Sequence, residues 1–129
     1  MPKILLVEDN DMNRDTLARL LGRRGYAVAV AGDGAKAIEL AEQTKPDIIL
    51  MDLDLPIIDG WEATRIIKSA PQTEKIPVLV LTANTSPEAR HEAFAAGCDE
   101  FSIKPIRLAD LVKAMEALLA GGGRKIEQI

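Results

Sequence analysis

Five short apolar runs, separated by longer amphipathic stretches, limit most strongly how this chain of 129 residues can fold. The runs occupy residues 4–7, 27–30, 48–51, 78–81 and 100–103, and the last of them is the weakest. The first four are nearly continuous rather than alternating, which is typical of strands in a parallel sheet that is covered on both faces. The runs therefore predict five strands of one parallel sheet.

The stretches between the runs carry helix signals. Gly25 and Gly97 each follow such a stretch, and glycine suits the position after a helix because it readily adopts left-handed backbone angles. Ser86 followed by Pro87 is typical of a helix start, with serine as the cap and proline in the first turn. The last stretch places apolar side chains at 108, 111, 112, 115, 118 and 119, an i, i+3, i+4 stripe.

Strands and helices thus alternate as (βα)₅ along the chain. Right-handed crossovers between parallel strands then give an α/β fold, a doubly wound five-stranded sheet with helices on both faces. We expect the flavodoxin-like strand order 2-1-3-4-5. In this order the first and third strands are neighbours at the point where the order reverses, which is where ligands bind in such sheets.

Composition narrows the class of protein further. The formal net charge of −4 argues against binding to nucleic acid or to anionic lipid. The apolar runs are too short to cross a bilayer, and the N-terminus does not have the pattern of a signal peptide. Cys98 is the sole cysteine, so it cannot form an internal disulfide. We expect it to be a small side chain that packs in or near the core. We expect a cytoplasmic protein that contacts neither nucleic acid nor membrane.

Chemically active side chains follow four of the five runs. They are Glu8 and Asp9 after the first run, Asp52 after the third, Thr82 and the small Ala83 after the fourth, and Lys104 and Pro105 after the fifth. The predicted sheet brings them to one edge, where clustered carboxylates need a cation and an all-oxygen site suits Mg²⁺. Mg²⁺ beside a carboxylate suggests phosphoryl chemistry with an aspartate as nucleophile. The ammonium of Lys104 can neutralise the charge of the phosphoryl oxygens, and the hydroxyl of Thr82 can form a hydrogen bond with one of them.

Four short motifs make the chain resemble a response-regulator receiver domain of bacterial two-component systems. They are Glu8-Asp9, the pattern D-x-x-L-P-x-x-D-G over residues 52–60, Thr82-Ala83, and Lys104-Pro105. Each motif is weak alone, but four in the right order, each at the end of a predicted strand, are specific. The resemblance runs from about residue 3 to residue 119.

The resemblance implies a role for each matching residue. Asp52 would accept the phosphoryl group. Mg²⁺, with Mn²⁺ as the alternative ion, would be held by Asp9, by Asp52, by Glu8 with a water between, and by the backbone carbonyl of Asp54.

Further roles implied by the resemblance concern the phosphoryl group and the switch. Thr82, Ala83 and Lys104 would contact the phosphoryl group. Thr82 would move together with Phe101, which stands where the family often has tyrosine. Pro105 would follow a cis peptide bond.

The same resemblance implies a phosphoacceptor switch rather than a turnover enzyme. The phosphoryl group would come from a phosphohistidine on a sensor histidine kinase or a histidine phosphotransfer protein, and a downstream protein target would receive the signal. We expect a stand-alone receiver domain over residues 1–120 and a flexible tail over residues 121–129. The alternative is a receiver domain cut from a longer regulator or hybrid kinase, with the tail as the start of its linker.

Two other classes of protein share part of the pattern. Residues 32–37, GDGAKA, match a dinucleotide-binding motif, but they follow the second strand at the predicted edge of the sheet and leave the other polar residues unused. Residues 52–54, DLD, resemble the nucleophile motif of haloacid-dehalogenase-type phosphatases. Those enzymes usually carry further acidic ligands after the lysine, and they have a cap domain. In this chain the acidic pair Glu8-Asp9 instead comes long before Lys104. Both interpretations are disfavoured.

Several residues near the motifs have simpler interpretations. Asp59 and Glu62 have the spacing of a capping box, which favours a helix cap over a metal ligand. His91 lies among charged residues and is expected at the surface. Met12 and Met115 are expected in stripes that face the core. Trp61 is compatible with the rim of the site or with packing on a loop.

Overall fold

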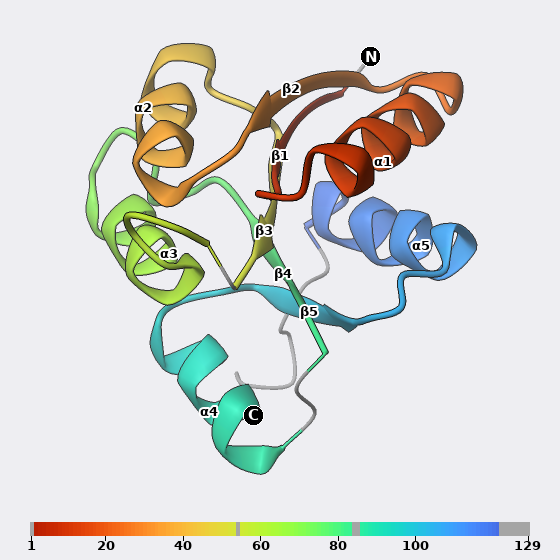
Figure 1. The fold of residues 1–129 in the computed structure, drawn as a ribbon. Helices are drawn as coiled ribbons and strands as arrows, with labels where there is room; N and C mark the ends of the chain where they lie inside the picture. Colours follow the sequence, from red (N-terminus) through yellow and green to blue (C-terminus); the bar gives the residue numbers. More distant parts are fainter. Residues whose placement is uncertain (1, 54, 84–85, 122–129) are drawn as a thin grey trace.

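A computed structural model of the chain describes residues 2–53, 55–83 and 86–121. The strands are β1 (Lys3–Val7), β2 (Ala27–Ala31), β3 (Ile48–Asp52), β4 (Val78–Thr82) and β5 (Glu100–Ile103). The helices are α1 (Asp11–Arg23), α2 (Gly34–Thr44), α3 (Gly60–Ser69), α4 (Pro87–Ala95) and α5 (Leu108–Leu119) (Figure 1). Every predicted strand is confirmed to within one residue at each end. Among the described helices, none has the length and hydrophobicity that crossing a membrane requires.

The five strands form one parallel sheet in the order β2-β1-β3-β4-β5, as predicted. The register places Val7 beside Met51, Asp52 beside Leu81, and Thr82 beside Ile103. The carboxyl ends of β1, β3, β4 and β5 therefore meet at one edge of the sheet.

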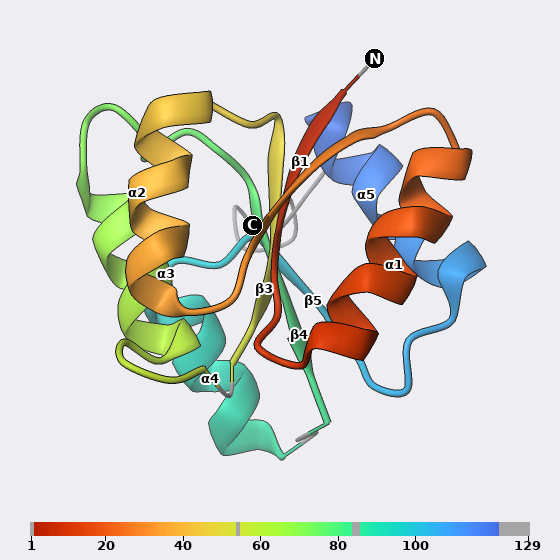
Figure 2. The same cartoon turned by 45° about the horizontal axis from the view of Figure 1, so that its top comes forward.

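Helices cover both faces of this sheet. Helices α1 and α5 lie on one face, and α2, α3 and α4 lie on the other (Figure 2). Successive residues of a strand point to opposite faces, so Ile4 and Leu6 pack toward α1 and α5, and Leu5 and Val7 pack toward α2 and α3. Burial on both faces explains why these strands are continuous apolar runs in the sequence.

The helix boundaries follow from local capping. Asn10 and Asp59 accept hydrogen bonds from backbone N–H groups in the first turns of α1 and α3, at 2.8 and 2.9 Å. The predicted capping role of Asp59 is thus confirmed. Ser86 caps α4 in the same way, and Gly97 adopts a φ of 102° after it.

Met12 does not face the core as predicted. Its side chain is 76% exposed in the first turn of α1, whereas Leu21 near the other end of that helix is fully buried. The two residues are about two and a half helical turns apart, so they lie on opposite sides of the helix. Met115 is fully buried as predicted, and His91 is exposed. Trp61 is half-buried and packs against the core on the α2–α3–α4 face.

The loop between β3 and α3 holds one residue in an unfavourable conformation. Ile57 has a φ of 70°, and its side chain is 80% exposed. A branched Cβ clashes with the backbone at positive φ, and this exposed side chain gains little packing in return. A Cβ at Gly34 would overlap the carbonyl oxygen of Ile58, so the loop lies tightly against the start of α2.

We expect Ile57→Asn to raise the free energy of unfolding by about 1 kcal/mol, because asparagine tolerates left-handed backbone angles. Ile57→Val keeps the branched Cβ and is the matched control, with an expected change of less than about 0.5 kcal/mol. Urea denaturation of the three proteins measures the difference. Equal stability of the asparagine and valine variants would contradict the inferred strain.

Candidate functional site

Three carboxylates gather where β1 and β3 end. Glu8 directly follows β1, Asp9 comes next, and Asp52 is the last residue of β3. One carboxylate oxygen from each residue lies within 4.8 Å of the other two. Glu8 and Asp52 are only 7% and 3% exposed, while Asp9 is open to solvent. The cluster therefore offers carboxylate oxygens that could bind a cation, with one side accessible to solvent.

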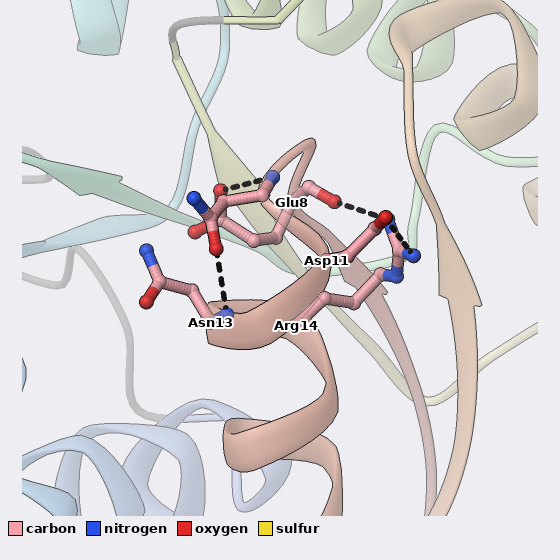
Figure 3. A network of polar contacts seen from close by, with 5 residues as sticks. Glu8, Asp11, Asn13 and Arg14 are labelled. Atoms are coloured by element: carbon pink, nitrogen blue, oxygen red, sulfur yellow. Dashed lines mark hydrogen bonds and ion pairs between the residues drawn. The ribbon is translucent and has the colours of Figure 1, made fainter.

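A network in the turn between β1 and α1 fixes Glu8 (Figure 3). The backbone N–H of Asn10 donates to Glu8 Oε2 at 3.1 Å, and the guanidinium of Arg14 donates to the Glu8 carbonyl oxygen at 3.1 Å. The same guanidinium pairs with Asp11 Oδ1 at 2.6 Å. A Cβ at Gly32, after β2, would lie 3.2 Å from Arg14 Nη1, so this glycine leaves space for the arginine.

Arg14 is a residue of the site that the sequence did not point to. Its three-residue spacing from Asp11 predicts a pair along the helix surface, and that pair is present. Nothing in the spacing indicates the second contact, with the carbonyl of Glu8, because it depends on how the turn folds back over the helix.

Lys104 brings a positive charge to the cluster from the loop after β5. Its Nζ lies 3.2 Å from Asp52 Oδ2 and 3.8 Å from Glu8 Oε1. The start of this loop is tied to β4, because the backbone N–H of Lys104 donates to the carbonyl of Thr82 at 2.8 Å. The peptide bond between Lys104 and Pro105 is cis. The ammonium offsets part of the repulsion among the carboxylates.

Glu8 is the acid whose ionisation the site changes most clearly. Burial raises the pKa of Glu8 from 4.5 to about 7, and a hydrogen bond with Asp52 and the negative charge of Asp52 act in the same direction. The backbone N–H of Asn10 and the charge of Lys104 oppose the rise. Near neutral pH a proton on Glu8 therefore relieves the crowding of charge, and a cation can take over that role.

The remaining predicted residues lie along β4 and β5. Thr82 is buried as the last residue of β4, and Ala83 follows it at the exposed edge. Phe101 is half-buried on β5, opposite Val80. The site thus brings together Glu8, Asp9, Asp52 and Lys104, with Thr82 on the neighbouring strand. Asp54, whose backbone carbonyl the sequence predicts as a metal ligand, lies outside the described residues.

A groove of about 420 Å³ opens beside the cluster, between α1 and the start of α5. Glu8 and Lys104 line its polar end, and apolar side chains that include Met12, Leu17 and Leu108 line the rest. The site therefore continues into a partly apolar surface rather than ending at the carboxylates.

Comparison with known proteins agrees with this geometry. The family model described as "Response regulator receiver domain" matches residues 4–116. Chemotaxis protein CheY4 of Vibrio cholerae is 32% identical, with a TM-score of 0.85 over 90% of this chain and 97% of that chain. The receiver domain of sensor histidine kinase PA1611 from Pseudomonas aeruginosa PAO1 is 35% identical, with a TM-score of 0.86 over 92% and 98% of the two chains.

Among curated proteins, response regulator MprA of Mycobacterium sp. (strain KMS) is 38% identical over 117 residues. The match covers 91% of this chain and 50% of MprA, so the chain spans about half the length of the curated relatives it matches. The family match includes both residues 32–37 and residues 52–54. Neither the dinucleotide-binding nor the phosphatase interpretation is favoured. With the family model covering most of its length and the strand order in agreement, the chain belongs to the response regulator receiver domains of two-component systems.

Proposed function

We propose that Asp52 accepts a phosphoryl group from a phosphohistidine of a sensor histidine kinase or a histidine phosphotransfer protein. The chain then signals to a downstream protein through altered contacts. The observation that carries this proposal is the convergence on Asp52 of two further carboxylates and one ammonium, with Lys104 Nζ at 3.2 Å. Membership of the receiver family supports the same assignment.

The donor set fits a small divalent cation. Three carboxylates that each offer an oxygen within 4.8 Å of the others suit a hard ion such as Mg²⁺, with Mn²⁺ as the alternative. The solvent-exposed side of Asp9 leaves room for the waters that Mg²⁺ usually keeps. The PA1611 receiver domain is described with a magnesium ion coordinated in its active-site cleft. When bound, the ion would neutralise carboxylate charge and polarise a phosphoryl oxygen.

The chain's own residues then divide the remaining work. A carboxylate oxygen of Asp52 forms the new O–P bond in line with the N–P bond that breaks on the donor imidazole. The ammonium of Lys104, already beside Asp52, offsets the charge of the transferring group. The Thr82 hydroxyl bonds a phosphoryl oxygen, and the small Ala83 leaves the entrance clear. Because Asp52 retains the product, the chain is a switch rather than a turnover enzyme.

The output of the switch follows from the added charge. An aspartyl phosphate places about one and a half to two negative charges at this edge of the sheet. Thr82 is drawn toward them, and Phe101 on the adjacent strand moves with it. The surface formed by α4, β5 and α5 changes as a result, and the downstream protein recognises this change.

The proposed receiver domain covers residues 1–120, and the proposed tail begins at residue 121. Residues 122–129 lie outside the described residues. The net charge of −4 supports signalling by protein contact rather than by binding to nucleic acid, and the proposed location is the cytoplasm.

Incubation with Mg²⁺ and acetyl phosphate is expected to add one phosphoryl group, detected by mass spectrometry. Asp52→Asn and removal of the metal abolish the product, and Lys104→Met slows its formation on the order of 100-fold. Asp59→Asn is the matched control. Asp59 caps α3, so its substitution is expected to leave phosphoryl uptake intact. Uptake by the Asp52 variant would contradict the assignment of the acceptor. Rapid turnover of many phosphate esters would favour a phosphatase instead.

The raised pKa of Glu8 predicts how stability depends on pH without a metal ion. Between about pH 4.5 and pH 7 the folded protein keeps a proton that the unfolded chain has lost, so the free energy of unfolding falls as pH rises. Glu8→Gln removes this contribution. Urea denaturation in EDTA across this range measures the slope for both proteins. Equal slopes would show that Glu8 is not the group responsible.

Phosphorylation is expected to shift amide NMR signals along β5 and α4 as well as at the site itself. Thr82→Ala is expected to leave phosphoryl uptake measurable while abolishing the shifts at Phe101 and in α4, because the hydroxyl that links the two regions is gone. Signals in α2, which contacts β1 and β2 near the opposite edge of the sheet from β5, serve as the internal reference. Shifts confined to the phosphorylation site would disprove the proposed output surface.

A further inference from the structure

The ring of Phe101 is held against α4 by two side chains. The guanidinium carbon of Arg90 lies 4.7 Å from the centroid of the ring. The ring of Phe94 meets it edge to face, with centroids 6.0 Å apart and planes at 86°. Arg90 and Phe94 are four residues apart, so they lie on the same side of α4 and form one surface that faces Phe101.

These contacts are prominent because α4 is otherwise lightly anchored. Its buried residue is Ala93, which offers a single methyl group to the core, and the half-buried Phe94 packs against the same cluster. By contrast, α5 buries four residues on the other face of the sheet: Leu111, Val112, Met115 and Leu118. The position of α4 relative to β5 therefore depends strongly on how Arg90 and Phe94 contact the Phe101 ring.

Because residue 101 is phenylalanine rather than tyrosine, its position depends more on the contact with Arg90. A tyrosine at this position could hold itself in place through a hydroxyl hydrogen bond, but Phe101 offers only its faces and edge. A cation over the face of the ring is attracted by the ring quadrupole. The guanidinium of the exposed Arg90 is such a cation, and it supplies this attraction from α4 to β5.

We propose that Arg90 is a positioning residue that holds Phe101 against α4 and thereby opposes the change that phosphorylation of Asp52 sets off. The inference rests on the proposed function, in which Phe101 moves with Thr82. If the ring leaves Arg90 in the phosphorylated state, the contact stabilises only the resting state. A contact made in one state alone biases the equilibrium between the two states, and by linkage it weakens binding at the distant site.

The size of the effect follows from the strength of the contact. At an exposed site a cation–π contact changes an equilibrium constant by about two- to fivefold. Removal of the Arg90 guanidinium is expected to tighten the binding of a phosphoryl analogue at Asp52 by this factor. The effect would act at a distance, because Arg90 lies on α4 and no residue of the carboxylate cluster does.

The test is the equilibrium affinity for beryllofluoride, a phosphoryl analogue, in saturating Mg²⁺. Arg90→Met keeps a long apolar side chain without the charge and is expected to bind about two- to fivefold more tightly than the wild type. Arg90→Lys keeps a cation and is expected to remain near the wild-type affinity. His91→Ala changes the exposed neighbour on the same helix and serves as the matched control with unchanged affinity.

A double-mutant cycle separates this role from a general effect on stability. In a Phe101→Leu background there is no ring face, so Arg90→Met is expected to change the affinity no further. Ring signals of Phe101 in the NMR spectrum of the metal-free protein report independently whether each Arg90 variant releases the ring.

Three results would overturn the inference. They are equal or weaker analogue binding by Arg90→Met, failure of Arg90→Lys to restore the wild-type affinity, and an effect of Arg90→Met that persists without the ring. If the wild type binds the analogue normally, any of these results contradicts the role of Arg90 and leaves the proposed function standing. A wild-type protein that binds no analogue and takes no phosphoryl group contradicts the proposed function, and this inference falls with it.

Discussion

Repulsion among three carboxylates is the interaction on which the site depends. Glu8 and Asp52 are almost fully buried, with Asp9 beside them, and such charges are costly to hold together out of water. Lys104 compensates only in part, because its ammonium is 3.2 Å from Asp52 but 3.8 Å from Glu8. Burial is the main cause of the raised pKa of Glu8, and the hydrogen bond with Asp52 and the negative charge of Asp52 add to it, so the site favours a proton where a cation can bind. The unfavourable crowding is thus what gives the site its demand for positive charge.

Such crowding persists only because the sheet beneath it is rigid. The register of β1, β3 and β4 places the ends of these strands side by side, and each strand is buried on both faces. The turn after β1 is tied down by Asn10 and Arg14, so Glu8 cannot simply swing into solvent. The packing of the core therefore supplies the free energy that holds like charges close together.

The sequence allowed the fold and most of the candidate site to be predicted because both depend on position along strands. Burial on two faces produces continuous apolar runs, and the residue after each run must lie at the carboxyl edge of the sheet. What could not be predicted depends on contacts between elements. The prediction that Met12 faces the core is wrong because a short apolar pattern does not fix the rotation of a helix, and the burial of Leu21 sets that rotation instead. The contacts that Arg14 makes with Glu8, and Arg90 with Phe101, need the folded geometry.

The two helices that precede and follow β5 are anchored unequally, and this inequality determines where a change of charge can be transmitted. On one face α5 buries Leu111, Met115 and two further apolar side chains, so moving it would expose a large apolar surface. On the other face α4 buries one small side chain, Ala93, within its helical residues, and Arg90 and Phe94 of this helix contact the Phe101 ring. A charge added at Asp52 supplies a limited free energy, and it acts first where the opposing contacts are weakest. Under the proposed function, α4 and β5 therefore move most, and the surface that they form with α5 changes while α5 itself stays anchored.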